Sequence, residues 1–239
     1  RFEILNSEYK RPWILKHKVK SRSSRFSEAF KEFATYYTGK KDLFSVGIVK
    51  NKVVLSYRKL GGLGETKFYV YEKRGEKEGK KPLLIIIPPI YDISPFDIWQ
   101  AREYAERGYK VAILDLGGVS YVSPYQPIGS ITKSLLKTMG DVHRLIQYTS
   151  KHENIDKERI GIFGFSLGGT VASLVFTVNK DIKVLSTVLA GGKFAELMTN
   201  SKQVLVALYK VMRKRQEELS TEAYLNKLKE TLIFDPVYF

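Results

Sequence analysis

The feature that most constrains this chain is one run of six residues, Gly164-Phe165-Ser166-Leu167-Gly168-Gly169. Residues 159–163 before it are β-branched and aromatic and predict a buried strand, whereas the apolar residues 170–176 after it predict a helix. A strand that turns directly into a helix requires small residues two positions before and after the serine, and glycine has no Cβ to collide there. The pattern therefore predicts a nucleophile elbow, in which the Ser166 hydroxyl projects from the sheet at the positive end of a helix dipole.

A serine nucleophile needs a base, a group that orients the base, and backbone N–H donors for the developing oxyanion. The turn itself supplies one donor, the N–H of Leu167. The second is expected in the loop after the apolar strand 83–87, where the sequence is Pro88-Pro89-Ile90-Tyr91-Asp92. Because proline has no N–H, we predict Ile90 as this donor and Tyr91 as the fallback. A simple strand-ending turn is the alternative for this loop.

Strands and helices alternate in the second part of the chain. Strands are expected at 83–87, 111–114, 159–163 and 184–189, and helices at 95–107, 131–151 and 170–176. Earlier strands are expected at 43–49, 52–57 and 67–72, with a hairpin loop at Gly61-Gly62-Leu63-Gly64. Apolar stripes predict further helices around 204–212 and 224–232, the last ended by Asp235-Pro236. This order predicts an α/β protein with a mainly parallel sheet and helices on both faces.

Two regions are expected along the chain. Residues 1–41 form a basic N-terminal extension, in which Ser24 can cap a helix with one apolar face. That face carries Phe26, Phe30, Phe33 and Tyr37. We expect the helix to pack onto the main domain, and contact with a lipid surface is the alternative. Residues 42–239 form the main domain, with a helical cap at about residues 193–232.

Composition limits the partners of the protein. The 239 residues include no cysteine, which excludes disulfides, thiol chemistry and cysteine-bound metals. The net charge of +15 allows contact with an anionic membrane surface, although a solvated, solubilising basic surface is the favoured explanation. No motif for specific nucleic-acid binding is present. Without an apolar run of membrane-spanning length or a visible secretory signal, we expect a cytoplasmic protein, and its charge-rich, amide-poor composition is common in thermophiles.

The same motifs carry a family resemblance. The order of strand, oxyanion loop, helix, strand with Asp115-Leu116-Gly117-Gly118, helix and Ser166 turn resembles the α/β-hydrolase superfamily over about residues 43–239. The sequence of residues 156–166 is similar to that before the nucleophile in the esterase and dienelactone-hydrolase-like branches. Residues 82–90 resemble the corresponding strand and loop of polyhydroxyalkanoate synthases, which use a cysteine at the elbow. Because Ser166 occupies that position here, hydrolysis is favoured over polymerisation.

One part of the superfamily pattern is missing. The catalytic acid and then a histidine normally follow the serine along the chain, but His17, His143 and His152 all precede Ser166. We expect His143 and His152 to be helix-surface or partly packed imidazoles. A sheet without its last strands would expose an apolar edge, so we expect a fragment whose acid and histidine lie beyond Phe239. A protein that has lost the triad is the alternative.

The resemblance implies a serine esterase or lipase-like hydrolase that cleaves a carboxylic ester through an acyl-Ser166 intermediate, without a metal or other cofactor. Tyr91 and the cap helices would shape the acyl pocket, which suggests a small-molecule ester with an apolar acyl group. Two alternatives remain: a non-catalytic binding or scaffold protein on the same fold, and an acyltransferase or polyester synthase-like enzyme. The sequence makes no prediction of the oligomeric state.

Overall fold

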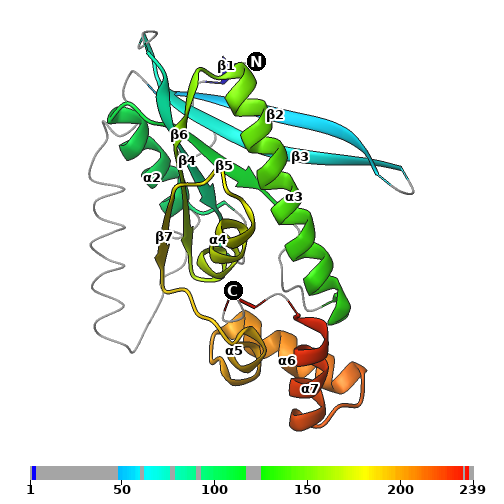
Figure 1. Cartoon of the computed structure of the whole chain (residues 1–239). Helices are drawn as coiled ribbons and strands as arrows, with labels where there is room; N and C mark the ends of the chain where they lie inside the picture. Colours follow the sequence, from blue (N-terminus) through cyan, green and yellow to red (C-terminus); the bar gives the residue numbers. More distant parts are fainter. Residues whose placement is uncertain are drawn as a thin grey trace, which may run out of the picture.

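A computed structural model describes residues 2–3, 48–59, 62–75, 79–89, 93–116, 125–233 and 235–236. Within these residues the chain forms a seven-stranded sheet with helices on both faces (Figure 1). The strands are β1 Phe2–Glu3, β2 Ile48–Lys59, β3 Gly62–Lys73, β4 Lys81–Ile87, β5 Lys110–Asp115, β6 Ile155–Phe165 and β7 Val184–Val188. The helices are α2 Pro95–Glu106, α3 Gly129–His152, α4 Leu167–Val178, α5 Phe194–Asn200, α6 Val204–Gln216 and α7 Thr221–Thr231.

The strand order in the sheet is β1-β2-β3-β5-β4-β6-β7. The strands β5, β4, β6 and β7 run parallel, and the helices between them cross over the sheet. The remaining pairings, β1 with β2, β2 with β3 and β3 with β5, are antiparallel. Both the α/β class and the parallel core of the sheet are therefore confirmed.

The first hairpin is longer than the sequence pattern indicates. A single strand, β2, continues through Lys50 and Asn51, where the prediction separated two strands. These two residues pair with Tyr71 and Val70 of β3, so the ladder is unbroken despite their polar side chains. The glycine cluster does mark the hairpin, but β3 already begins at Gly62. The predicted strand residues 43–47 lie outside the described residues.

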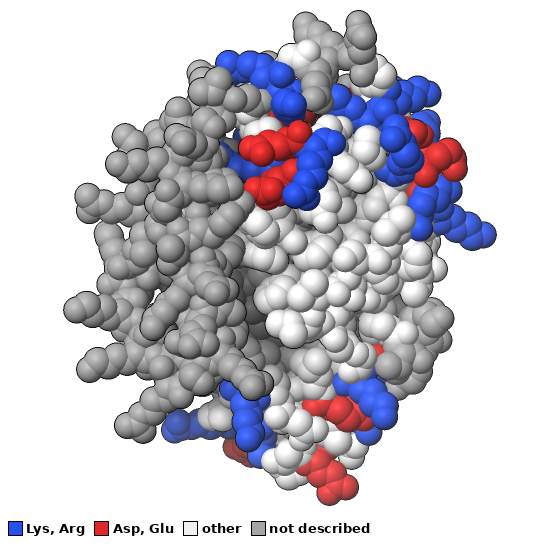
Figure 2. Space-filling model, turned by 90° about the vertical axis from the view of Figure 1, so that its left-hand side faces the viewer, with Lys and Arg blue, Asp and Glu red and all other residues white. Residues whose placement is uncertain are grey.

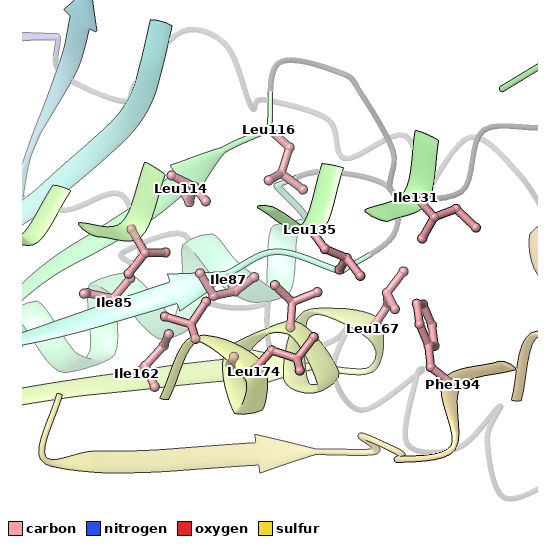
Figure 3. Close-up of a cluster of buried hydrophobic side chains, with 14 of the residues drawn as sticks. Ile85, Ile87, Leu114, Leu116, Ile131, Leu135, Ile162, Leu167, Leu174 and Phe194 are labelled. Atoms are coloured by element: carbon pink, nitrogen blue, oxygen red, sulfur yellow. The ribbon is translucent and has the colours of Figure 1, made fainter. Parts of the chain in front are cut away.

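Alternating side chains give the sheet two apolar cores, because successive residues of a strand point to opposite faces. On one face, Ile86 and Ile113 pack against α2. On the other face, Ile85 and Leu114 pack against α3 and α4, as Figure 3 shows for this cluster. Burial on both faces explains why β4 and β5 are almost entirely apolar.

The helices α5, α6 and α7 lie together at the carboxyl ends of the parallel strands (Figure 1). They occupy the range 193–232, for which we propose a helical cap. Their apolar residues continue the cluster formed by the sheet with α3 and α4, and Phe194 lies beside Leu167 (Figure 3). The Thr132 hydroxyl of α3 also donates a hydrogen bond of 2.5 Å to the carbonyl oxygen of Thr231. These contacts fix the helices over the carboxyl edge of the sheet.

The strand β7 forms one edge of the described sheet, on the left in Figure 1. Its side chains are largely exposed, and Val184 keeps 61% of its surface accessible. Figure 2 views the molecule from this side and shows a band of uncharged residues between groups of Lys and Arg. No strand among the described residues pairs with the outer edge of β7, so this edge is both apolar and open there.

The proposed N-terminal extension is described only at Phe2 and Glu3, which form β1. Its predicted helix, including Ser24, Phe26, Phe30, Phe33 and Tyr37, lies outside the described residues. The contact of this segment with an anionic membrane surface stays a prediction. Among the described helices, none combines the length and the hydropathy needed to cross a bilayer.

Two buried tyrosines occupy the centre of the α5–α7 layer. Tyr209 of α6 and Tyr224 of α7 are completely inaccessible to solvent, and neither hydroxyl has a hydrogen-bond partner among the described residues. Burial raises the pKa of both phenols above the ordinary value of 10.0, because the charged phenolate is poorly solvated there. The folded protein therefore holds these two protons more tightly than the unfolded chain does.

The raised pKa values predict loss of stability in alkali. Below about pH 10 the two phenols are protonated in both the folded and the unfolded protein, so their ionisation does not change the free energy of unfolding. Above that pH the unfolded chain ionises first, and the free energy of unfolding falls as the pH rises toward the raised pKa values of the folded state. Tyr209→Phe and Tyr224→Phe should each reduce this loss and stabilise the protein at neutral pH by about 1 kcal/mol, since a buried unpartnered hydroxyl is removed. Urea unfolding at about pH 7 and about pH 11 measures both effects.

The matched control is Tyr125→Phe, because the Tyr125 side chain is 83% exposed. This variant should behave as the wild type at both pH values. Destabilisation of both core variants at neutral pH would instead mean that the two hydroxyls take part in stabilising hydrogen bonds.

Candidate active site

The backbone at Ser166 connects β6 to α4 in a sharp turn. Ser166 has φ 55° and ψ −125°, a conformation that a residue with a side chain adopts at a cost of about 1–3 kcal/mol. Neighbouring groups hold it there: its N–H donates to the carbonyl oxygen of Val188 at 2.8 Å. Its own carbonyl oxygen accepts the N–H groups of Gly169 at 2.9 Å and Thr170 at 3.2 Å. The serine is therefore fixed between β7 and the first turn of α4.

Glycine is sterically required on both sides of this turn. A Cβ on Gly164 would lie 2.2 Å from the carbonyl oxygen of Gly168. A Cβ on Gly168 would lie 2.3 Å from the carbonyl oxygen of Ile87 and 2.6 Å from that of Pro88. The second contact brings the turn against the end of β4, where the predicted oxyanion loop begins.

The N–H of Leu167 is available at this turn. Leu167 is the first residue of α4, and the first N–H groups of a helix have no acceptor within it. Among the described residues no other group accepts a hydrogen bond from this N–H. The Leu167 side chain is only 9% exposed and packs near Phe194, which limits rotation of the backbone (Figure 3). Ser166 itself is half-buried, and its hydroxyl does not cap the helix.

The other two predicted site residues, Ile90 and Tyr91, lie outside the described residues. The loop is described as far as Pro88 and Pro89, which have no N–H to donate. The approach of Pro88 to Gly168 shows that the loop starts beside the Ser166 turn. The roles of Ile90 and Tyr91 therefore stay predictions.

The described histidines are not at Ser166. His143 is exposed on α3, where its Nε2 lies 3.0 Å from the Gln147 side-chain amide. His152 is also exposed and stacks on Tyr148, with 4.7 Å between ring centroids. His152 lies just before β6 and Ser166 just after it. The two residues are therefore separated by the length of this strand, roughly 30 Å. Both histidines have the predicted helix-surface positions, whereas His17 lies outside the described residues. The part of the chain that the structure describes contains no cluster of acidic, histidine or cysteine residues that could hold a metal ion.

The residues that hold the loop after β7, which spans residues 189–193, were not predicted from the sequence. Thr170 of α4 bonds to Gly191 through its hydroxyl, and the Asp235 carboxylate accepts the N–H groups of Lys193 and Phe194. The sequence indicated Asp235 only as the end of the last helix, but α7 already ends at Thr231. The available signal was an aspartate after a helix, a residue type that often accepts backbone N–H groups.

The sheet order, the crossover helices and the strained serine after β6 define an α/β-hydrolase fold, as the sequence resemblance implied. A sequence profile of the prolyl oligopeptidase family matches residues 94–224, more than half of the chain. The chain belongs to the prolyl oligopeptidase family, within the α/β-hydrolase superfamily.

Three of the proteins that this chain resembles are distant from it in sequence. A probable 2-oxo-3-(5-oxofuran-2-ylidene)propanoate lactonase from Bradyrhizobium sp is 26% identical over 127 residues, which cover 51% of each chain. The chain thus spans about half the length of this curated relative. Acylaminoacyl peptidase from Pyrococcus horikoshii superposes with a TM-score of 0.54 at 13% identity, over 84% of this chain and 31% of the peptidase. A hypothetical protein of Pseudomonas aeruginosa, PA2218, superposes with a TM-score of 0.52 at 18% identity, over 73% of this chain and 55% of that protein. At these identities the solved structures show the fold alone.

The close contact at Gly168 predicts that replacement by alanine has very different effects on stability at two glycines. Gly168→Ala should destabilise the protein by about 3 kcal/mol or more, because its Cβ would overlap backbone atoms that cannot rotate away. Gly161→Ala is the matched control on β6, since its Cβ would meet atoms only at 3.7 Å and beyond. This control should change stability by less than about 1 kcal/mol. Thermal unfolding compares the two variants, and a Gly168→Ala protein as stable as the control would contradict the described turn.

Proposed function

We propose that the protein is a serine hydrolase that cleaves a carboxylic ester through an acyl-Ser166 intermediate. The observation that carries the proposal is the strained backbone of Ser166 beside the N–H of Leu167, which has no acceptor among the described residues. A strained serine between a strand and a helix, next to a free backbone donor, is the arrangement that presents a hydroxyl to a carbonyl group. Family membership supports the broader reaction class, hydrolysis.

The reaction proceeds in two halves. The Ser166 oxygen attacks the carbonyl carbon and gives its proton to a base, and the Leu167 N–H holds the negative oxygen together with the N–H of Ile90 or, as the fallback, Tyr91. The bond to the alcohol then breaks, the alcohol takes the proton, and the acyl group stays on Ser166. Water next attacks the acyl carbon, its proton passes through the base to the serine oxygen, and the free acid leaves. No base and no orienting acid is identified beside Ser166 among the described residues, and both stay predictions.

The substrate is proposed to be a small-molecule ester with an apolar acyl group. Helices α5–α7 lie over the carboxyl edge of the sheet, where Phe194 and Leu167 form part of an apolar cluster beside the serine. Tyr91 is proposed to line the same acyl site. The distant similarity to a probable lactonase supports an ester, because a lactone is a cyclic ester. No step requires a metal or an organic cofactor.

The second candidate is hydrolysis of a peptide bond, which the family match favours. An amine is a poor leaving group unless an acid protonates it, whereas an alcohol of low pKa leaves without such help. The two candidates are separated with one acyl group presented as an ester and as an amide. The esterase is supported if the ratio of kcat/KM for the ester to kcat/KM for the amide exceeds the ratio of their uncatalysed hydrolysis rates. A smaller ratio supports the peptidase.

Replacement of the serine tests the proposed nucleophile. Ser166→Ala should lower the kcat of p-nitrophenyl ester hydrolysis by about 10³-fold or more, and a fluorophosphonate probe should label the wild type at Ser166. Ser173→Ala is the matched control, because Ser173 lies on the same helix and its hydroxyl only donates to the Gly169 carbonyl oxygen at 3.0 Å. The control should keep wild-type activity and labelling.

Two results would contradict the ester hydrolase. An unlabelled wild-type protein without activity would favour a binding or scaffold protein. Transfer of the acyl group to an added alcohol in preference to water would favour an acyltransferase or a polyester synthase-like enzyme, and product analysis by mass spectrometry detects it.

A further inference from the structure

The loop after β7, residues 189–193, adopts a strained path beside Ser166. Leu189 has φ 55° and Lys193 has φ 52°, so both ends of the loop have left-handed backbone at residues other than glycine. Such conformations persist only where the surroundings hold them. The loop begins one residue after Val188, whose carbonyl oxygen accepts the N–H of Ser166 at 2.8 Å. The start of the loop is therefore linked to the Ser166 backbone through this hydrogen bond.

One side of the loop is held by Thr170. Its hydroxyl donates to the Gly191 carbonyl oxygen at 3.0 Å and accepts the Gly191 N–H at 3.3 Å. The Thr170 side chain is 2% exposed, and its backbone N–H donates to the Ser166 carbonyl oxygen at 3.2 Å. Thr170 thus ties the middle of the loop directly to the Ser166 turn.

The other side is held by Asp235, which is 4% exposed. Its Oδ1 accepts the N–H of Lys193 at 3.0 Å, and its Oδ2 accepts the N–H of Phe194. Phe194 begins α5, is fully buried, and lies beside Leu167 in the apolar cluster (Figure 3). Asp235 therefore determines how Phe194 packs against Leu167, whose N–H is the proposed oxyanion donor.

We propose that Asp235 is a positioning residue for the hydrolysis, an inference that rests on the proposed function of Ser166. Asp235 does not touch the reacting atoms. By holding Lys193 and Phe194, it keeps the Phe194 side chain against Leu167 and so fixes the direction of the Leu167 N–H. This donor acts on charge that develops only in the transition state, so loss of Asp235 lowers kcat and leaves KM nearly unchanged.

Two substitutions at Asp235 in the full-length protein test this role. Asp235→Ala should lower kcat by about 10- to 100-fold with KM within about twofold of the wild type, because small displacements of a catalytic group have effects of this size. Asp235→Asn keeps one carbonyl oxygen as an acceptor and should give an intermediate kcat. If the alanine variant does not fold, the asparagine variant supplies the comparison.

The matched control is Thr132→Val, which removes the 2.5 Å hydrogen bond between α3 and the Thr231 carbonyl oxygen. It loosens the same helical layer without touching the loop, so stability should fall while kcat stays at the wild-type value. Hydrogen exchange followed by mass spectrometry should show faster exchange around Lys193 and Phe194 in the Asp235 variants only.

Two sets of results would overturn the positioning role alone: a wild-type kcat in Asp235→Ala, or an equal fall of kcat in Asp235→Ala and Thr132→Val. A wild-type protein that is inactive toward esters and unlabelled at Ser166 would overturn the proposed function and the positioning role together. The hydrogen-exchange comparison still reports in that case whether Asp235 holds the loop.

Discussion

The backbone of Gly168 lies so close to the carbonyl oxygens of Ile87 and Pro88 that no side chain fits between them. This contact brings the start of α4 against the end of β4, and the neighbouring contact of Gly164 with Gly168 closes the turn between β6 and α4. The strands β4 and β6 and the helix α4 therefore meet at one point. Ser166 lies at that point, and its strained conformation is a consequence of how closely the three backbones approach.

A second layer of contacts fixes the surroundings of this turn. The N–H of Ser166 is bonded to β7, and the loop that follows β7 is held by Thr170 from one side and by Asp235 from the other. The helices α5–α7 share one apolar cluster with the sheet, α3 and α4. The proposed acyl site is thus bounded by parts of the chain that are far apart in sequence but packed into a common core. Rigid surroundings of this kind favour a donor that is oriented before the substrate binds.

The features that the sequence predicted well are those with a local cause. The apolar runs of β4 and β5 reflect burial on both faces, and the glycines around Ser166 reflect a steric requirement within a few residues. Pairing between strands was harder to foresee, because the polar residues Lys50 and Asn51 continue β2 through their pairing with the neighbouring strands β1 and β3.

The contact of Asp235 with α5 could not be predicted for a similar reason. It joins residues that are 41 and 42 positions apart, and the local pattern around an Asp-Pro pair indicates only the end of a helix. The predicted helix 131–151 matches α3 closely, since its amphipathic period is local and strong. The second oxyanion donor and the acyl-site tyrosine depend on loop conformation, which no periodic pattern encodes, and Ile90 and Tyr91 stay predictions.

We propose that an acyl group forms a bond to the Ser166 oxygen during turnover. Rapid mixing of the full-length protein with an activated ester, followed by acid quenching and peptide mass spectrometry, measures this bond directly. We expect a transient mass increase equal to the acyl group on the peptide that contains Ser166. Turnover of the ester with that peptide unmodified, or with the acyl group on another residue, would contradict it.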